Sequence, residues 1–211
     1  MLKVGVIGCG TMGQLHSAIF KKLPGVELAA VADLDDQRRQ EAADALGVKT
    51  YREGQELIAD PSIDLVDIAV PTDGHAGLLD QAIKADKHVF CEKPVVRTNA
   101  ECDLLEKLAI QTGKRIGVGH VVRFAPEYVA ARDKVLAGDI GRAAVSRTFR
   151  GGSQFPKGWQ DWYADYARSG GVILDLAIHD IDYLRWCFGD VARVYAKTTQ
   201  GLTEEGMEHA F

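Results

Sequence analysis

Three residues in this sequence have side chains and surroundings suited to oxidising an alcohol. Lys93 lies in Cys91-Glu92-Lys93-Pro94, where its ammonium could hydrogen-bond a reacting oxygen and stabilise the alkoxide that develops as hydride leaves. His179 titrates near neutral pH and could take the proton of a hydroxyl group as a general base. Asp175, one helical turn earlier, could hold the substrate or tune the imidazole. We predict these three as catalytic residues.

Each of these residues also has a simpler interpretation. Lys93 could be a surface lysine before an ordinary turn proline, and its bond to Pro94 could be cis or trans. Asp175 and His179 could lie on a solvated acidic helix face or belong to a metal site. We expect no metal, because hydride transfer beside a lysine needs none and the sequence marks no third ligand.

A glycine-rich segment near the N-terminus matches the G-x-G-x-x-G fingerprint of dinucleotide-binding turns. Gly8 permits the tight turn, Gly10 lets the backbone approach a pyrophosphate, and Gly13 lets the following helix sit close to the strand. That helix would begin near Thr11 and Met12, and its free N–H groups would face the phosphates. The alternative is a glycine-rich turn in some other α/β protein.

An acidic residue stands where this fingerprint requires one. Asp33 follows the predicted strand of residues 26–32, 20 residues after Gly13. A carboxylate there accepts both adenosine ribose hydroxyls and repels a 2′-phosphate, which favours NAD over NADP. Arg38 and Arg39 weaken this preference, because a nearby arginine could accommodate the phosphate.

Further polar and aromatic residues follow predicted strands or lie in a predicted loop. His75, in Pro71-Thr72-Asp73-Gly74-His75, either lines the cofactor cleft or is an N-terminal helix residue without a role. Trp162 and its aromatic neighbours could form a substrate-side wall, although loop aromatics more often simply pack. Arg123 follows the sixth strand. The predicted cofactor-binding residues are Gly8, Gly10, Thr11, Met12, Gly13, Asp33, Pro71, Thr72, His75, Glu92 and Lys93, and the predicted substrate-binding residues are Lys93, Arg123, Trp162, Asp175 and His179. The other histidines, among them His16, carry no comparable support.

The elements that must position these residues alternate between apolar runs and amphipathic stretches as far as residue 119. Strands are predicted at 2–7, 26–32, 65–70, 88–91 and 115–118, with a further short strand at 49–51. Helices are predicted at 12–22, 36–46, 55–59, 76–85 and 100–112. Strands that are apolar on both faces and alternate with helices predict a doubly wound parallel sheet of the Rossmann type.

The pattern changes after residue 120. We predict a helix at 126–137, a strand at 143–150, a loop at 151–171, a helix at 174–188 and a strand at 191–199. A second sheet of two strands is small for an independent unit, and Glu208-His209-Ala210-Phe211 looks like the start of another strand. We therefore expect a NAD-binding domain at 1–122 and, at 123–211, the beginning of an α+β domain that appears incomplete in this chain.

Composition excludes several other classes of protein. The chain has 211 residues, of which 46% are hydrophobic and 26% charged, with a formal net charge of −5. Scattered basic residues argue against a nucleic-acid partner, and no apolar run reaches the roughly 18 residues of a membrane span. The four cysteines form no C-x-x-C pair, and no secretory signal precedes the first strand. We expect a cytoplasmic protein.

Taken together, these motifs resemble the Gfo/Idh/MocA family of oxidoreductases. The resemblance rests on the glycine fingerprint, on Glu92-Lys93-Pro94 and on Gly171-x3-Asp175-x3-His179-Asp180, and it runs along essentially the whole chain. It implies an N-terminal Rossmann domain and a C-terminal open, mixed β-sheet that commonly mediates oligomers. Members of the family continue well beyond residue 211, so we expect this chain to be part of a longer protein.

The resemblance also implies roles for individual residues. Lys93 matches the lysine that contacts substrate and cofactor, and His75 matches a histidine beside the nicotinamide. Asp175 and His179 match the acid and the histidine of the family's inositol dehydrogenases, whereas several relatives carry tyrosine in place of the histidine. The expected function is NAD-dependent oxidation of a secondary alcohol on a polyol, sugar or sugar derivative. A NAD-dependent glycosidase acting through transient oxidation, and a non-catalytic sugar- or NAD-sensing regulator, remain as alternatives.

Overall fold

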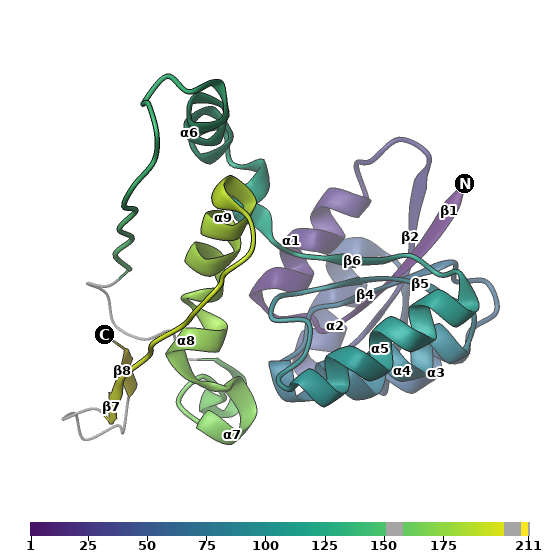
Figure 1. Ribbon diagram of the computed structural model, residues 1–211. Helices are drawn as coiled ribbons and strands as arrows, with labels where there is room; N and C mark the ends of the chain where they lie inside the picture. The colour runs from purple at the N-terminus through teal and green to yellow at the C-terminus, as the bar shows by residue number, and fades with distance from the viewer. Residues whose placement is uncertain (151–157, 201–207, 211) are drawn as a thin grey trace. The chain divides into compact units, whose positions relative to one another are not determined.

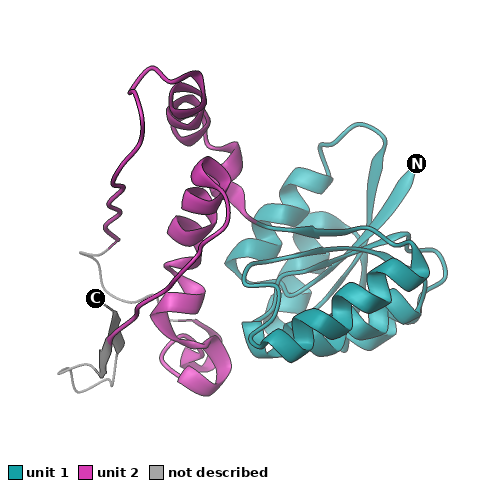
Figure 2. Ribbon diagram, in the orientation of Figure 1, with its two compact units in different colours: residues 1–119 teal, residues 120–211 magenta. Residues whose placement is uncertain are grey.

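A computed structural model describes residues 1–150, 158–200 and 208–210 of the protein. The chain forms two compact units, residues 1–119 and residues 120–211, which are coloured separately in Figure 2. The division lies at 119/120, against 122/123 in the sequence-based expectation. Each unit is described by itself below.

Six parallel strands form the sheet of unit 1. Its order, β3-β2-β1-β4-β5-β6, changes direction beside β1, since β2 lies on one side of β1 and β4 on the other (Figure 1). Open α/β sheets bind their ligands at such a switch point, outside the carboxyl ends of the strands. The strands are β1 (Leu2–Ile7), β2 (Val26–Ala32), β3 (Lys49–Tyr51), β4 (Leu65–Ile68), β5 (His88–Cys91) and β6 (Ile116–Val118).

Helices cover both faces of this sheet. Figure 1 shows α3, α4 and α5 together along one face, and an apolar cluster joins them to the sheet. A second cluster, built on Val4, Val6 and Val31, packs against residues of α1 and α2 on the other face. The helices are α1 (Thr11–Phe20), α2 (Asp36–Leu46), α3 (Gly54–Ala59), α4 (His75–Lys84) and α5 (Asn99–Thr112), with the short 3-10 helix η1 (Thr72–Gly74) before α4.

The period-2 alternation of a strand explains why two clusters form. In β4, Val66 and Ile68 are buried in the cluster beside α3, α4 and α5, so Asp67 between them points to the opposite face. Complete burial of an aliphatic side chain of this kind stabilises the fold by about 1.5–3 kcal/mol. An acidic side chain inside such a strand therefore needs a partner.

The secondary structure predicted for residues 2–119 is confirmed, with shifts of one or two residues at some element ends. The strand predicted at 65–70 is shorter, because β4 ends at Ile68 and the chain turns at Pro71. The fold class of a doubly wound parallel sheet is likewise confirmed.

Unit 2 consists mainly of short helices. Helix α6 packs on α9 through Tyr128 and Tyr183, whose rings meet edge to face at 5.0 Å, and Arg132 Nε donates to Trp186 O at 3.2 Å. The antiparallel pair β7–β8 aligns Thr198 with Ala210. Its elements are η2 (Val121–Phe124), α6 (Pro126–Ala137), η3 (Trp159–Asp161), α7 (Tyr166–Ser169), α8 (Gly171–Asp175), α9 (Ile178–Phe188), β7 (Thr198–Gln200) and β8 (Glu208–Ala210).

Three predictions in this unit are wrong. Residues 143–150 form no strand, because a strand requires a hydrogen-bonded neighbour and no described residue pairs with them. The strand expected at 191–199 shrinks to its last residues, which belong to β7. The helix expected at 174–188 is broken at Leu176–Ala177, where both N–H groups bond to Val172 O. Within the loop predicted at 151–171, residues 151–157 lie outside the described residues, and the remainder contains η3 and α7.

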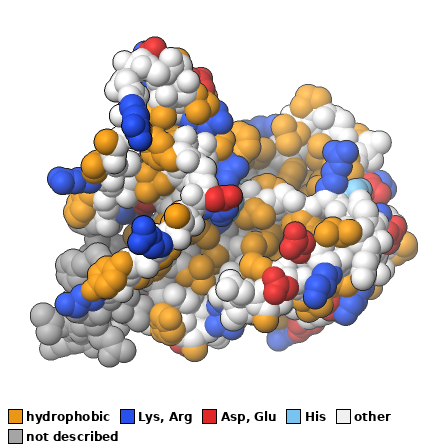
Figure 3. All heavy atoms as spheres, in the orientation of Figure 1, with side chains coloured by type: hydrophobic (Ala, Val, Ile, Leu, Met, Phe, Trp, Pro, Cys, Tyr) orange, Lys and Arg blue, Asp and Glu red, His pale blue; other side chains and the backbone are white. Residues whose placement is uncertain are grey.

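Surface properties are mixed on the face shown in Figure 3. Basic, acidic and hydrophobic side chains are interspersed there rather than gathered by charge. Among the described residues, no helix is long and apolar enough to cross a membrane.

Candidate functional site

The carboxyl ends of the strands in unit 1 are in register, which aligns the predicted cofactor residues along one edge of the sheet. Ile7 is the Cα partner of both Ala32 and Ile68, and the alignment continues through Cys91 to Val118. The residues that follow these strands therefore share the edge. They are Gly8, Asp33, Ala69, Glu92 and Gly119.

The glycine turn at this edge is close-packed on one side and open on the other. Gly8 has a φ of +99°, and a Cβ there would overlap the carbonyl of Ala69. A Cβ on Gly13 would overlap the carbonyl of Gly8, so α1 can lie this close to β1 only without a side chain. Above Gly10, by contrast, the nearest atom to a Cβ would be Arg38 Nη1 at 3.8 Å.

This open side fits a dinucleotide. The first backbone bond of the helix runs from Gln14 N–H to Gly10 O, which leaves the N–H groups of Thr11, Met12 and Gly13 directed out of the helix N-terminus. Backbone donors and the helix dipole together favour phosphate oxygens at that position. The hydroxyl Oγ1 of Thr72 is buried at the same edge and has no hydrogen-bond partner among the described residues.

Asp33 is positioned by the glycine turn itself. Its Oδ2 accepts the N–H of Cys9 at 2.6 Å, and its Oδ1 accepts the N–H of Asp35 at 2.8 Å. The carboxylate is half-buried and keeps lone pairs for ribose hydroxyls. Of the two nearby arginines, Arg39 bonds to Asp33 O and to Asp36, whereas Arg38 lies beside Gly10.

His75 ties together the two turns that follow β4 and β5. Its Nδ1 lies 2.8 Å from Pro94 O and its Nε2 lies 2.9 Å from Val70 O. The ring is buried, and burial lowers its pKa in spite of these carbonyl contacts. A neutral ring has one N–H and donates to one of the two carbonyls at a time. Through Pro94 O, His75 contacts the backbone just beyond Lys93. Thr72, in the turn after β4, stands with it at the cofactor edge.

Lys93 is held by its own backbone. Its N–H donates to Glu92 Oε2 at 3.1 Å, and its peptide bond to Pro94 is cis. Glu92 N–H donates in turn to Ile68 O, which fixes the turn on β4. Lys93 thus lies at the carboxyl edge of the sheet. The residues before and after it, Glu92 and Pro94, are held by Ile68 O and by the His75 ring.

Two buried side chains beside this turn were missed by the sequence-based prediction. His16 Nδ1 lies 2.8 Å from Asp67 Oδ2, and His16 Nε2 lies 3.4 Å from Glu92 Oε1. The signal for them was present: Asp67 interrupts an apolar strand, and His16 follows Gly13 by three residues, on the same face of α1. Neither signal by itself predicts the pair, because their meeting depends on how α1 packs on the sheet.

Burial and pairing act against each other in this group. Burial lowers the pKa of His16, but contacts with the Asp67 and Glu92 carboxylates outweigh it and raise the pKa to about 9. Burial raises the pKa of Asp67, which the hydrogen bond with His16 offsets only in part. Burial by itself would raise the pKa of Glu92, but His16 and the Lys93 N–H hold this pKa below its usual value.

The predicted residues of unit 2 lie on two helices instead of one. Asp175 is the buried last residue of α8, and His179 lies in the first turn of α9. The break at Leu176–Ala177 therefore places Asp175 on α8 and His179 on α9, where one continuous helix at 174–188 was expected.

Arg123 and Trp162 are each in contact with neighbours within unit 2. Arg123 donates to Asp182 through Nε at 2.8 Å and Nη2 at 2.6 Å, a bidentate pair that joins η2 to α9. Trp162 stacks on Tyr163 with ring centroids 4.0 Å apart.

Within residues 1–150, 158–200 and 208–210, no three His, Cys, Asp or Glu side chains gather as a metal ion would require.

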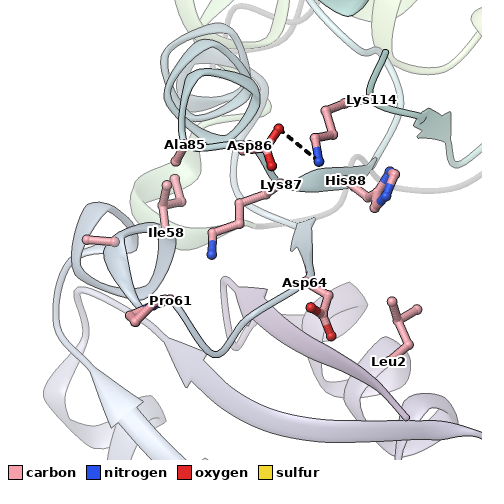
Figure 4. A pocket seen from close by; sticks show the side chains of 10 residues that line it. Leu2, Ile58, Pro61, Asp64, Ala85, Asp86, Lys87, His88 and Lys114 are labelled. Carbon is pink, nitrogen blue, oxygen red and sulfur yellow. Dashed lines mark ion pairs between the residues drawn. The ribbon is translucent and has the colours of Figure 1, made fainter. Parts of the chain in front are cut away.

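A cavity of about 570 Å³ lies at the opposite edge of the sheet (Figure 4). Its charged groups are already engaged: Lys114 pairs with Asp86 at 2.9 Å, and Lys87 Nζ donates to the carbonyls of Asp60 and Ile63. Leu2 and His88, the first residues of β1 and β5, place it at the amino ends of the strands. Ligands of open α/β sheets bind at the other edge.

Comparisons with known proteins agree with this geometry. Residues 2–120 match the GFO/IDH/MocA family described as an oxidoreductase family with a NAD-binding Rossmann fold, and residues 128–211 match the GFO/IDH/MocA C-terminal domain. The chain is 34% identical to the myo-inositol 2-dehydrogenase of Thermotoga maritima over 97% of its own length and 60% of that protein. It is 30% identical to the 1,5-anhydro-D-fructose reductase of Ensifer adhaerens over 99% of its length and 63% of that protein.

A solved structure of a relative has a similar fold. The crystal structure of myo-inositol 2-dehydrogenase from Lactobacillus plantarum superposes with a TM-score of 0.80 at 30% identity, covering 94% of this chain and 59% of that one. The chain thus spans about 60% of the length of the relatives it matches. It belongs to the GFO/IDH/MocA oxidoreductase family, and unit 1 is the NAD-binding Rossmann domain of that family.

Proposed function

We propose that the protein transfers hydride between NAD and a secondary alcohol of a polyol, sugar or sugar derivative. The observation that carries this proposal is the place of Lys93: it follows β5 at the edge that carries the glycine turn and Asp33, on a turn fixed by Glu92 and His75. The names of the inositol 2-dehydrogenase and anhydrofructose reductase relatives support the substrate class.

The proposed catalytic residues act on the hydroxyl group that is oxidised. NAD+, when bound, supplies the hydride acceptor. His179 removes the proton of the substrate hydroxyl, and Asp175 holds the substrate or orients the imidazole. Lys93 donates a hydrogen bond to the same oxygen as its negative charge develops. Arg123 and Trp162 contribute to the substrate side.

The test is NAD+ reduction by the purified full-length protein with a panel of inositols, sugars and sugar derivatives. We expect absorbance at 340 nm to rise with at least one of them, and Lys93→Ala to lower kcat by about 10²-fold or more. Lys84→Ala is the matched control, because Lys84 forms only an exposed i,i+4 pair with Asp80. Activity that survives Lys93→Ala unchanged would remove Lys93 from the mechanism.

The same assay separates the alternatives. A glycosidase that acts through transient oxidation regenerates its NAD+, so glycoside cleavage without net NADH would indicate that reaction. Tight binding of NAD and sugar with no turnover would indicate a sensing protein.

We also propose that the complete protein is a cytoplasmic homo-oligomer assembled through its C-terminal sheet. The antiparallel pair β7–β8 is the part of that sheet described in this chain. Light scattering of the full-length protein after size exclusion measures the mass, and a monomer at micromolar concentration would contradict the proposal.

A further inference from the structure

Three buried titratable side chains from three elements meet beneath the Lys93 turn. His16 projects from α1, Asp67 from the middle of β4, and Glu92 from the residue after β5. Their exposed fractions are 9%, 0% and 7%. We call this group the His16 cluster. Of its members only Glu92 enters the proposed function, through the Lys93 turn, and neither His16 nor Asp67 has a role there.

The geometry of the cluster favours a charged imidazole between two ionised carboxylates. His16 Nδ1 lies within hydrogen-bond distance of Asp67 Oδ2 at 2.8 Å, whereas Nε2 lies 3.4 Å from Glu92 Oε1, an ion-pair contact that leaves Oε1 without a hydrogen bond from any described residue. A neutral ring carries one N–H, so its second nitrogen would direct a lone pair at a carboxylate. Asp67 Oδ1 receives no hydrogen bond from any described residue, which makes the contact with His16 its principal stabilisation.

Packing leaves Glu92 little freedom to move away. A Cβ on Gly119 would lie 2.9 Å from Glu92 Oε1, so the carboxylate rests directly on the backbone of that residue. Phe90 meets the His16 ring edge to face at 5.7 Å and limits its rotation. The remaining oxygen, Oε2, accepts the Lys93 N–H. His16, Glu92 and the Lys93 backbone therefore form one continuous chain of contacts.

Other titratable groups also face the cluster. Cys91 interacts electrostatically with Asp67 and Glu92, and burial raises its thiol pKa well above the usual value. His75 lies within the field of Glu92 from the α4 side, and Lys93 lies beside it. Burial lowers the pKa of His75, whereas the Asp67 and Glu92 carboxylates raise the pKa of His16.

We propose that His16 is a positioning residue for Lys93: as an imidazolium between Asp67 and Glu92, it holds the Glu92 carboxylate on the Lys93 backbone N–H. Loss of the His16 proton leaves two buried carboxylates without a shared cation, which weakens the hold of the Glu92 carboxylate on the Lys93 amide. The catalytic consequence of this inference rests on the proposed function, in which Lys93 meets the substrate oxygen.

The first test does not depend on turnover. In uniformly ¹⁵N-labelled full-length protein, we expect both His16 ring nitrogens to be protonated at pH 7. Between pH 7 and 10, the Lys93 amide proton should shift with the same midpoint as the His16 ring, whereas the Lys84 amide should not. A singly protonated His16 ring at pH 7, or a Lys93 amide that does not follow it, overturns the proposal.

The second test uses two amide substitutions that each replace one ring nitrogen. In His16→Asn the amide nitrogen takes the place of Nδ1 and faces Asp67, and in His16→Gln it takes the place of Nε2 and faces Glu92. We expect kcat to fall by about tenfold or more in His16→Asn and clearly less in His16→Gln, with similar KM for NAD+ and similar thermal stability. Equal kcat losses, or the reverse order, overturn the positioning role.

The two proposals fail separately. If the wild-type protein turns over no substrate in the panel, the proposed function fails, and the resonance titration still decides whether His16 controls the Lys93 amide. If the wild-type protein turns over but the two variants do not differ, the proposed function stands and the role of His16 falls.

Discussion

Unit 1 and unit 2 hold their charged side chains in different ways. In unit 1 the His16 cluster is buried, and each member contacts another through a defined atom. In unit 2 the pair Arg123–Asp182 keeps 42% of the arginine side chain exposed. A buried charge that loses its partner is stranded away from water, whereas a half-exposed one exchanges its partner for solvent. The contrast indicates that removing one partner costs more in the His16 cluster than in the Arg123–Asp182 pair.

The largest effect that separates the units is expected at Asp67. Asp67→Ala leaves Glu92 and His16 buried with one partner fewer and should lower the free energy of unfolding by about 3 kcal/mol. Urea denaturation followed by circular dichroism measures the change. Asp182→Ala in unit 2 is the matched variant, with an expected loss of about 1 kcal/mol or less. Equal losses would erase the distinction between the units.

Cofactor affinity should depend on unit 1 alone. Asp33→Ala removes a carboxylate that we expect to bond ribose hydroxyls and that accepts the Cys9 N–H, and should weaken NADH binding by about 1.5–3 kcal/mol. Its preference for NADH over NADPH should also fall. Fluorescence titration with both nucleotides measures this. Asp190→Ala, at an exposed position of unit 2, is the control, and weaker NADH binding there would contradict the comparison.

The stability of unit 1 should fall at alkaline pH through His16. Its folded pKa of about 9 lies above the ordinary 6.5, so its contribution is complete below pH 6.5 and is lost as the pH rises through 9. The loss should be on the order of 2 kcal/mol between pH 7 and pH 10. Thiols that become exposed on unfolding ionise in the same pH range, so the relevant quantity is the difference between the wild type and His16→Asn. Parallel stability curves for the two proteins would show that His16 carries no such linkage.

The smallest effect is expected at Arg123. Arg123→Ala removes both hydrogen bonds to Asp182 and a cation–π contact with Trp186. Because the arginine is partly exposed, the substitution should lower the free energy of unfolding by about 1 kcal/mol or less. High salt should reduce that cost further. Thermal unfolding at low and high ionic strength measures it. A loss above 3 kcal/mol would place this pair in the same energetic class as the His16 cluster.

Sequence pattern predicted unit 1 better than unit 2 for a physical reason. Each strand of unit 1 finds its neighbours within residues 1–119, so local apolar runs such as 26–32 become paired strands with almost no change of bounds. In unit 2, residues 143–150 were also expected to form a strand but pair with no described residue. Periodicity records which side chains favour burial, and it does not record whether a partner strand is present.

The candidate site divides in the same way. The sequence by itself determined the glycine turn, Asp33 and the Lys93 turn, because their roles follow from backbone chemistry and from their place after a strand. It did not determine the break between α8 and α9, since residues 174–188 are predicted as one continuous helix. Only the tertiary structure decided that His16 meets Asp67 and Glu92. His16 lies 51 positions before Asp67 in the chain, and Glu92 follows a different strand. Only the packing of α1 against the sheet brings their charges together.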